Sequence, residues 1–472
     1  MLTGAEYLTS VQDGRRLFID GKRIEDPLNH PLLASAFRFA ASGYDRAYQP
    51  GATHGPYYTI PLTQGDLRAQ LKAMGHWDDL ASVTSTGLMA LITAAARMSD
   101  HPEYGDYVAR IRAYHQHCME NDLRCVQAIT DAKGDRRLSP SKQDDPDLYT
   151  RIVERRADGV VINGAKLHIT AAATAHELIV MPTKMMKPGE EDWAIACAVP
   201  VNAEGVSIVN TTYAPRGDDP DYWPISSQAS YPEGFIIFDH VFVPNERIFL
   251  AGHVEHSATF AHSLGLWERL GGTAHMIEAA DTLVGFAQLI AEANGVERIS
   301  HIKDKIAEMI IYATLIRGCL EAAITHAEQT PEGWVHPNEL YTNAAKHYGA
   351  AEWNLMVRHL HDIAGGAVLT APSGRDLANP EIGELVAKYL RGKAGVDAAY
   401  RARLFHAIRD YTADAFGGWW LVTLIQSGGG LYAQRMVSTK HYPLDKAKQR
   451  ALRIANFPET ATPTAIASPA QP

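Results

Sequence analysis

The apolar residues of this chain change their spacing within the stretch DGVVINGAKLHI, residues 158–169. Apolar side chains follow the two-residue repeat of a β-strand here, and Asn163-Gly164 stands between the two halves. An Asn-Gly pair between strand-like runs is typical of a two-residue hairpin turn, so the stretch predicts a β-hairpin. Further β-rich segments, separated by Gly, Pro and Asp, are predicted at 177–185, 193–201, 206–211 and 234–244.

Helical periodicity flanks this β segment on both sides. On the N-terminal side it begins near Thr63, after an irregular segment, residues 1–50, that contains a hairpin around residues 17–22. On the C-terminal side it returns after about Leu264 and includes a long helix at 398–425. Long helices joined by short turns pack as a bundle. The order of helices, sheet and helices excludes a doubly wound fold, in which helix and strand alternate.

The composition excludes several classes of protein. The 472 residues carry 44 Lys and Arg against 54 Asp and Glu, a formal net charge of -10, so nucleic acid is not an expected partner. Four cysteines without a CxxC pair argue against a disulfide framework and a zinc ribbon. The N-terminus lacks the pattern of a signal peptide and the apolar runs are short, so we expect a cytoplasmic protein with no membrane partner.

Two histidine groups raise the question of a metal site. His115, His117 and Cys118 lie together in the sequence, as do His359 and His361. Residues two apart on a helix point to different faces, so we predict that neither group binds a metal. The motifs GxGxxG, GxxxxGKS/T, HExxH and GxSxG are absent, which removes the usual signatures of dinucleotide-binding, P-loop, zincin and α/β-hydrolase proteins.

Charged residues, glycine and hydroxyls concentrate where the first helical segment meets the β segment. Backbone amides in such a loop can face a phosphate or a ring carbonyl, while Arg136 and Lys142 supply positive charge. A solvated linker between domains has the same composition, and both interpretations stay open. The residues concerned are Thr130, Asp131, Lys133, Gly134, Asp135, Arg136, Ser141 and Lys142.

A second candidate site follows the predicted hairpin, where His168 and Thr170 precede the small residues 171–173. Small side chains let a planar ligand approach the backbone, and the Thr170 hydroxyl can bond a ring nitrogen. A tightly packed strand end explains the same residues. Gly271-Gly272 and Gly365-Gly366 interrupt helical patterns at a cost of about 1 kcal/mol per glycine, so either they end helices or something large approaches the backbone there.

Eight segments, in order along nearly the whole chain, share their wording with one family. They are TDAKGDR (130–136), PSKQ (140–143), DPDLY (145–149), GAK (164–166) with His168 and Thr170, FDHVFVP (238–244), SHIKDK (300–305), DIAGG (362–366) and NPEIG (379–383). The chain thereby resembles the 4-hydroxyphenylacetate 3-hydroxylase oxygenase family, which also contains 4-hydroxybutyryl-CoA dehydratase.

The resemblance implies an α+β fold similar to that of acyl-CoA dehydrogenases. It consists of an N-terminal helical domain, a central β domain and a C-terminal helical bundle that builds a homotetramer. The corresponding segments of this chain are 1–136, 137–265 and 266–456. They are followed by a tail, residues 457–472, whose Pro, Ala and Thr content predicts disorder.

The resemblance also implies FAD between the β domain and the bundles. The charged junction and the strand end become cofactor-binding candidates, and Gly365 and Gly366 are brought toward the flavin of a neighbouring subunit. The full set is Thr130, Lys133, Gly134, Asp135, Arg136, Ser141, Lys142, His168, Thr170, Ala171, Gly365 and Gly366.

The dehydratase branch of the family holds an iron–sulfur cluster on three cysteines and one histidine, and such clusters need thiolate ligands. The resemblance implies that this chain has no cluster and no metal. The aligned positions are Ser82–Leu88, which contains no cysteine, Thr273 in place of the third cysteine, and Leu266 or Trp267 in place of the histidine.

Other positions give mixed evidence on the branch to which the chain is more similar. The segment 179–183 and Glu233 are closer in wording to the dehydratase. The Tyr and Lys that serve acid–base chemistry in that branch align with Leu270 and Ala274, so those groups are lost here as well.

The oxygenase branch needs no metal. The resemblance to it implies the oxygenase component of a two-component monooxygenase. A separate flavin reductase supplies FAD as FADH2, which reacts with O2 to a C4a-hydroperoxide that hydroxylates a small aromatic, heteroaromatic or amine-bearing substrate. The protein contributes positioning, a dry cavity and a group that deprotonates the substrate.

The phenol-binding residues of that branch are replaced in this chain. Phenol-hydroxylating members commonly hold an Arg and a Tyr in the segment 75–80 and a His at the position of Asp131, where this chain has His76, Leu80 and Asp131. A simple para-substituted phenol is therefore disfavoured. His76 is the expected base because imidazole titrates near working pH, with Asp131 and Thr170 as the other catalytic candidates. Alternatively, His76 caps a helix and Asp131 caps a turn.

Two other functions stay open. One is a cluster-free flavoprotein dehydratase or isomerase that acts on a CoA thioester, and it differs from an oxygenase in consuming neither oxygen nor reduced flavin. The other is a non-catalytic flavin-binding or scaffold protein, which would not stabilise any oxygenated flavin.

Overall fold

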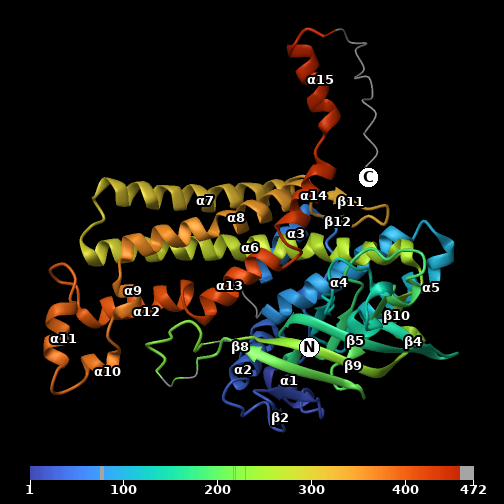
Figure 1. Ribbon diagram of the computed structural model, residues 1–472, viewed down its shortest axis with the longest axis horizontal. Coiled ribbons are helices and arrows are strands. Elements are labelled where there is room, and N and C mark those ends of the chain that lie inside the picture. The colour runs from blue at the N-terminus through green and yellow to red at the C-terminus, as the bar shows by residue number, and fades with distance from the viewer. Residues whose placement is uncertain (75–78, 216, 218, 229, 458–472) are drawn as a thin grey trace.

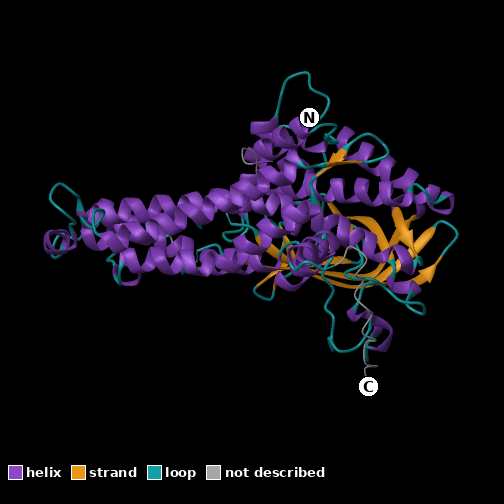
Figure 2. Ribbon diagram, turned by 90° about the horizontal axis from the view of Figure 1, so that it is seen from above, coloured by secondary structure: helices purple, strands orange, loops and turns teal. Residues whose placement is uncertain are grey.

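The chain folds into a β-rich part, covered by the N-terminal helices, and a long helical bundle that extends away from it, as Figures 1 and 2 show for the computed structural model. The structure describes residues 1–457 except 75–78, 216, 218 and 229. The predicted base His76 and, apart from Phe457, the predicted disordered tail lie outside the described residues. The predicted α+β class, with helices, sheet and helices in that order, is confirmed.

Helices dominate the first 120 residues, as predicted from Thr63 onward. They are α1 (Gly4–Ser10), α2 (Ala34–Ala47), α3 (Gln64–Met74), α4 (Asp79–Met98) and α5 (Gly105–Glu120). The predicted hairpin is also confirmed, as β1 (Leu17–Ile19) and β2 (Lys22–Ile24). The prediction of an irregular segment was wrong for α2, which buries Phe37, Ala40 and Tyr44. Many of its core-facing residues are alanines, which give little hydrophobic contrast.

Helix α4 is the central helix of this part. Within the described residues, only its segment Leu80–Met98 is long and apolar enough to cross a membrane, and 83% of that segment is buried inside the protein. It packs against α5, strand β3 (Cys125–Ala128) and helix α6 (Val254–Asn294) of the bundle. A helix that is buried to this extent is a core helix of the folded protein.

Two sheets form the centre of the β-rich part. One has the order β2-β1-β8-β9-β5-β4 and the other β10-β7-β6-β3, and apolar residues from both belong to a single core. Because β1, β2 and β3 take part, the sheets extend beyond the segment 137–265. The other strands are β4 (Arg151–Arg155), β5 (Gly159–Thr170), β6 (Glu177–Val180), β7 (Ile195–Pro200), β8 (Val206–Thr212), β9 (Pro232–Pro244) and β10 (Ile248–Ala251), which confirms the four later predicted segments.

The predicted hairpin at Asn163-Gly164 was wrong. Strand β5 runs through this pair, and the hairpin connects β4 to β5 instead. At Gly164 the register against β9 shifts, φ is +130° and a Cβ would lie 2.6 Å from the Cα of Thr150. The Asn163 side chain accepts a hydrogen bond from the His240 N–H at 2.7 Å. The pair thus forms a β-bulge, in which glycine supplies the unusual φ.

The C-terminal bundle is built on α6, α7 (Ser300–Thr325) and α8 (Glu339–Ala364), which lie side by side in Figures 1 and 2. Helix α6 begins ten residues before the predicted start and continues through Gly271-Gly272, where the Lys346 side chain approaches it. The predicted helix 398–425 is two helices, because the chain breaks at Ala413-Asp414. The remaining elements are β11 (Glu328–Gln329), β12 (Val335–His336), α9 (Ala367–Thr370), α10 (Gly374–Leu377), α11 (Gly383–Leu390), α12 (Ala398–Thr412), α13 (Ala415–Gln426), α14 (Leu431–His441) and α15 (Leu444–Ile454).

Candidate functional site

The ends of β5 and β9 meet the bundle at one polar contact. Thr170, the last residue of β5, pairs in register with Glu233 of β9. The Thr170 hydroxyl donates to Oε1 of Glu233 at 2.8 Å, and the indole N–H of Trp419 on α13 donates to the same oxygen at 2.7 Å. One carboxylate oxygen therefore joins the β-rich part to the bundle.

Aromatic rings surround this contact on the bundle side. Trp419 packs on Tyr213, with ring centroids 4.7 Å apart, and Phe416 packs on both. Burial raises the pKa of Glu233, while the hydrogen bonds from Trp419 and Thr170 and the nearby His168 act in the opposite direction. The site thus combines a half-buried carboxyl with flat apolar surfaces.

The backbone around Thr170 departs twice from regular strand geometry. His168 and Ala171 both have positive φ, 61° and 60°, in the left-handed region that costs energy for residues with a side chain. His168 is exposed, whereas Ala171 begins a fully buried turn, residues 171–174. Gly234 closes this packing, because a Cβ there would lie 2.7 Å from that of Ala172. Strain of this kind is typical of ligand sites.

The charged junction is an ordered loop. The N–H of Asp135 donates to Oε1 of Gln143 at 3.0 Å, and the Gln143 amide donates back to the Asp135 carbonyl at 2.9 Å. Lys133 and Gly134 both have positive φ. Burial lowers the pKa of the half-buried Lys133, and the Arg136 charge lowers it further. Two cations that disfavour each other present a natural site for an anion.

The junction is connected directly to β5. The N–H of Leu167 donates to the Thr130 carbonyl at 2.7 Å. One position before, Lys166 and Asp131 form an ion pair at 2.7 Å, with side chains 1% and 2% exposed. The structure therefore brings the two predicted parts of the site, the junction and the strand end, onto one framework.

Asp131 is engaged in this ion pair through Oδ1. Its Oδ1 also accepts the N–H of Thr150 at 2.9 Å, and Lys166 donates to the carbonyls of Ile129 and Met181 at 3.0 and 2.8 Å. Burial lowers the pKa of Lys166, and the Asp131 charge raises it. Through these contacts the Asp131–Lys166 pair holds the segment that follows β3 against β5.

The remaining predicted cofactor residues lie at the margins of the site or far from it. Lys142 is exposed, and the exposed Ser141 donates to Glu190 at 3.2 Å. Gly365 ends α8 with φ +81°, and Gly366 precedes α9. Figure 1 places α9 at the end of the bundle that points away from β5 and β9. Gly365 and Gly366 are thus separated from Thr170 within one chain.

The segment aligned with the cysteine pair of the cluster lies on α4, and Thr273, aligned with the third cysteine, lies on α6; both carry hydroxyls in place of thiols. Thr86 donates to the Ser82 carbonyl at 2.9 Å and Thr273 to the Arg269 carbonyl at 2.6 Å, so both hydroxyls are bonded to their own helices. At Gly271 a Cβ would lie 3.8 Å from Oγ1 of Thr86. This set does not fit an iron–sulfur cluster, which needs thiolates.

Neither do the cysteines form a metal site. Cys118 and Cys125 lie with their sulfurs 3.7 Å apart as free thiols. Burial raises the pKa of the Cys118 thiol and raises that of Cys197 to about 12, which disfavours the thiolate that a metal requires. In the part of the chain that the structure describes, no three His, Cys, Asp or Glu residues are arranged around a common ion position.

Sequence reasoning missed two members of the site, the Trp419 donor and the role of Glu233 as its acceptor. Trp419 lies 186 positions from Glu233. The only signal in the sequence was the run FGGWW, residues 416–420, whose adjacent tryptophans are unusual in a helix.

Comparison with known proteins gives consistent matches along the chain. Two family models, described as 4-hydroxyphenylacetate 3-hydroxylase N terminal and C terminal, match residues 3–250 and 257–456. A 4-hydroxyphenylacetate 3-monooxygenase oxygenase component from Thermus thermophilus is 28% identical, over 88% of this chain and 89% of its own length. A 4-hydroxybutyryl-CoA dehydratase/vinylacetyl-CoA-Delta-isomerase from Clostridium aminobutyricum is also 28% identical, over 97% of this chain and 100% of its own length.

A solved structure agrees in fold. It is the oxygenase component of 4-hydroxyphenylacetate 3-monooxygenase complexed with FAD and 4-hydroxyphenylacetate, with a TM-score of 0.87 and 26% identity. The match covers 97% of this chain and 98% of that chain.

Proposed function

Because the chain belongs to the 4-hydroxyphenylacetate 3-hydroxylase family, we propose that it is the oxygenase component of a two-component, FADH2-dependent monooxygenase. Its cofactor is FAD, which a separate flavin reductase delivers in reduced form. Its substrate is a small aromatic, heteroaromatic or amine-bearing molecule. When bound, the reduced flavin activates O2, of which one atom enters the substrate and the other leaves as water.

The described residues fit FAD. Lys133 and Arg136 offer paired positive charge for a pyrophosphate, on a loop that Gln143 holds in place. The Thr170 hydroxyl offers a polar edge, and the buried turn at residues 171–174 holds it in place. The buried Asp131–Lys166 pair holds these two halves in register.

The hydroxyl side chains between α4 and α6 are the observation that favours an oxygenase over a dehydratase. The segment Ser82–Leu88, which contains Thr86, and Thr273 stand where the dehydratase branch has its thiolates, and the hydroxyls of Thr86 and Thr273 are bonded to their own helices. Oxygen transfer from a reduced flavin requires no ligand there. Oxygen transfer is therefore proposed to occur beside Thr170 and Glu233, and not between α4 and α6.

The group that activates the substrate is proposed to be His76. Asp131, the other aligned candidate, is occupied by Lys166 and the Thr150 N–H, so it would act by holding the junction. Imidazole is the side-chain type best suited to removing a proton at neutral pH. His76→Ala should keep oxygen consumption but release hydrogen peroxide in place of product.

The decisive experiment measures the metal content of the enzyme and its dependence on O2. The enzyme purified without oxygen should contain no iron or sulfide. With FADH2, O2 and a substrate of the proposed class it should form a hydroxylated product, whereas FADH2 and O2 without the enzyme give only hydrogen peroxide. Stoichiometric iron and sulfide, together with activity on a CoA thioester that consumes no O2, would overturn the proposal.

A second candidate is a cluster-free dehydratase or isomerase that acts on a CoA thioester. The full-length match to the Clostridium enzyme supports it. Assays of 4-hydroxybutyryl-CoA with oxidised FAD in the absence of oxygen separate the two candidates, because only the dehydratase needs neither O2 nor reduced flavin.

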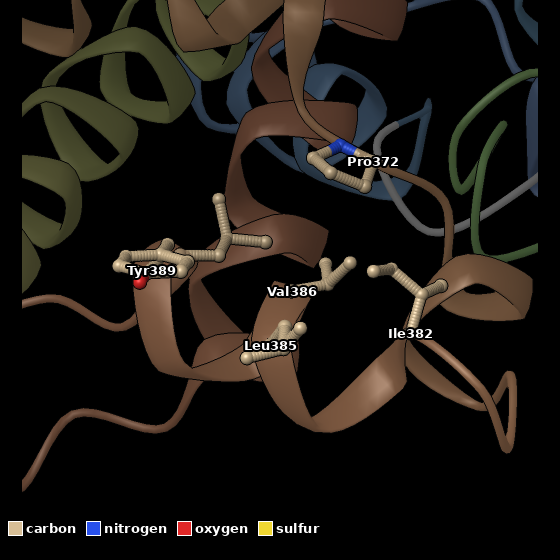
Figure 3. A pocket seen from close by; sticks show the side chains of 6 residues that line it. Pro372, Ile382, Leu385, Val386 and Tyr389 are labelled. Atoms are coloured by element: carbon tan, nitrogen blue, oxygen red, sulfur yellow. The ribbon is translucent and has the colours of Figure 1, made fainter.

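We also propose that the chain forms a homotetramer in the cytoplasm. Large apolar side chains are exposed along the bundle, among them Ile310, Ile311 and Leu315 of α7. A further apolar hollow of about 380 Å³ lies around α11 and is lined by Pro372, Ile382, Leu385, Val386, Tyr389 and Leu390. Figure 3 labels the first five of these residues. Contiguous exposed apolar surface marks association. Assembly would also let Gly365 and Gly366 approach the flavin site of a neighbour.

A further inference from the structure

The direction of one hydroxyl proton is fixed at the strand end. A threonine hydroxyl has one proton and two lone pairs. The Thr170 proton points to Oε1 of Glu233, 2.8 Å away. Thr170 therefore offers only lone pairs to a ligand beside it, and acts as an acceptor.

Glu233 is held so that it keeps this proton. Strand pairing between β5 and β9 sets it opposite Thr170, and the Trp419 indole N–H binds the same carboxylate oxygen at 2.7 Å. Tyr213 and Phe416 pack around the Trp419 ring. The carboxylate cannot turn away without losing both hydrogen bonds.

An acceptor at this point distinguishes two states of a flavin. On reduction, a flavin ring nitrogen that was an acceptor gains a proton and becomes a donor. A hydroxyl that can only accept complements the reduced ring, whereas it sets two acceptors against each other with the oxidised ring. We infer that Glu233 is a positioning residue that directs the Thr170 hydroxyl and thereby makes the site bind reduced FAD more tightly than oxidised FAD. This rests on the proposed function, which places FAD at Thr170.

Among the described residues, few ionisable groups lie around Glu233. His168 on β5 is the charged neighbour that bears on it, and the phenol of Tyr213 packs behind Trp419. Strand β8, which pairs with β9, and helix α13 carry no Asp, Glu, Lys, Arg or His. Burial is the largest influence on Glu233 and raises its pKa.

Protonation of Glu233 would reverse the hydrogen bond. A neutral carboxyl carries its own O–H, which can donate to the Thr170 oxygen and release the threonine proton toward the ligand. Acidification through the Glu233 pKa should therefore reduce the preference for reduced FAD. The nearby His168 lowers the pKa of Glu233 and so opposes this protonation. The pH response is therefore measured against a variant that lacks only the titrating carboxyl.

The experiment measures the dissociation constants of oxidised and reduced FAD for the full-length protein, without oxygen, and compares their ratio. Glu233→Ala should lower the wild-type preference for reduced FAD about tenfold, the factor for one hydrogen bond. Glu233→Gln keeps an oxygen that accepts from Trp419 and Thr170, so it should retain the preference at neutral pH and lose the acid-induced decline.

Thr170→Val provides the coupling test. In the Thr170→Val background, Glu233→Ala should change the ratio no further, because the hydroxyl that Glu233 directs is gone. A wild-type ratio in Glu233→Ala would overturn the inference. If Glu233→Ala does not fold, the same pH response in wild type and Glu233→Gln would overturn it. Failure of the wild type to bind FAD in either state would instead refute the proposed function.

Discussion

Arg136 and Arg137 are adjacent exposed cations with different partners. Arg137 pairs with Asp135 at 2.6 Å, whereas the charge of Arg136 bears on Lys133. Arg136→Ala should weaken FADH2 binding by about 1.5–3 kcal/mol, the range for a hydrogen bond to a charged group. Arg137→Ala is the matched control and should leave binding unchanged. Equal losses in anaerobic titrations of the two variants would mean that the loop carries no specific phosphate contact.

Lys346 is a buried cation in the bundle, and its pKa should affect stability. It donates to the Leu424 carbonyl at 2.9 Å and to Ser427 at 3.2 Å. Burial lowers its pKa to about 8, against the attraction of Glu268. Between that value and 10.5, the unfolded chain binds more protons at this site than the folded chain, so the free energy of unfolding rises with pH there.

The variant Lys346→Met isolates this effect. Lys346→Met should be more stable relative to wild type at pH 7 than at pH 10, by up to about 3 kcal/mol in the free energy of unfolding. Only the wild type buries a charge at this position at pH 7 and loses that charge by pH 10. Chemical denaturation at both pH values measures the difference. Lys303→Met, at an exposed position on α7, should show the same difference at both pH values. No pH dependence in Lys346→Met would show that Lys346 is charged throughout.

Asp131 shows what a sequence can and cannot predict about a single residue. The motif from Thr130 to Arg136 predicts a site in this loop from local sequence alone, because those residues are close in the chain. The occupation of Asp131 by Lys166, 35 positions later, depends on how β3 and β5 come together. Local sequence contains no information about that ion pair, so Asp131 looked available for catalysis.

At the scale of elements, the bulge in β5 depends on Gly164. Gly164→Ala and Gly189→Ala both place a side chain at positive φ, which costs about 1–3 kcal/mol, but nothing lies within 4 Å of a Cβ at Gly189. Gly164→Ala also meets the Thr150 backbone, so it should destabilise by about 1 kcal/mol or more beyond Gly189→Ala. Urea unfolding followed by circular dichroism measures both. Equal destabilisation would mean that the β4–β5 contact relaxes freely.

The elements differ in how far local sequence predicts them. Strands 206–211 and 234–244 were predictable because one face is buried and the other is not, so the alternation is visible. The Asn163-Gly164 pair predicted a turn, but Gly164 uses its positive φ in a bulge within β5. Whether the positive φ of Gly164 makes a turn or a bulge depends on β9. The residues of β9 that pair with this part of β5 lie about 75 positions further along the chain. The Glu233–Trp419 contact was invisible for the same reason.

At the scale of the whole molecule, the hollow at α11 should be covered by another copy of the chain. Leu385→Asp places a charge among the apolar side chains of Figure 3 and should reduce the assembly from four times 51.7 kDa to a smaller species. Lys388→Asp, on the same helix but outside the hollow, is the control. Light scattering after size-exclusion chromatography measures the mass, and an unchanged mass in Leu385→Asp would exclude the hollow from the interface.

The buried helix α4 has a consequence for how the protein is made. Its apolar surface is covered by α6, and the indole N–H of Trp267 bonds Thr93, 174 positions earlier in the chain. At roughly 5–20 residues per second, a ribosome needs on the order of ten seconds or more to synthesise that distance. During this interval the nascent chain exposes a segment apolar enough for a membrane. A message cut short before α6 therefore yields a product whose fate is capture by chaperones or aggregation.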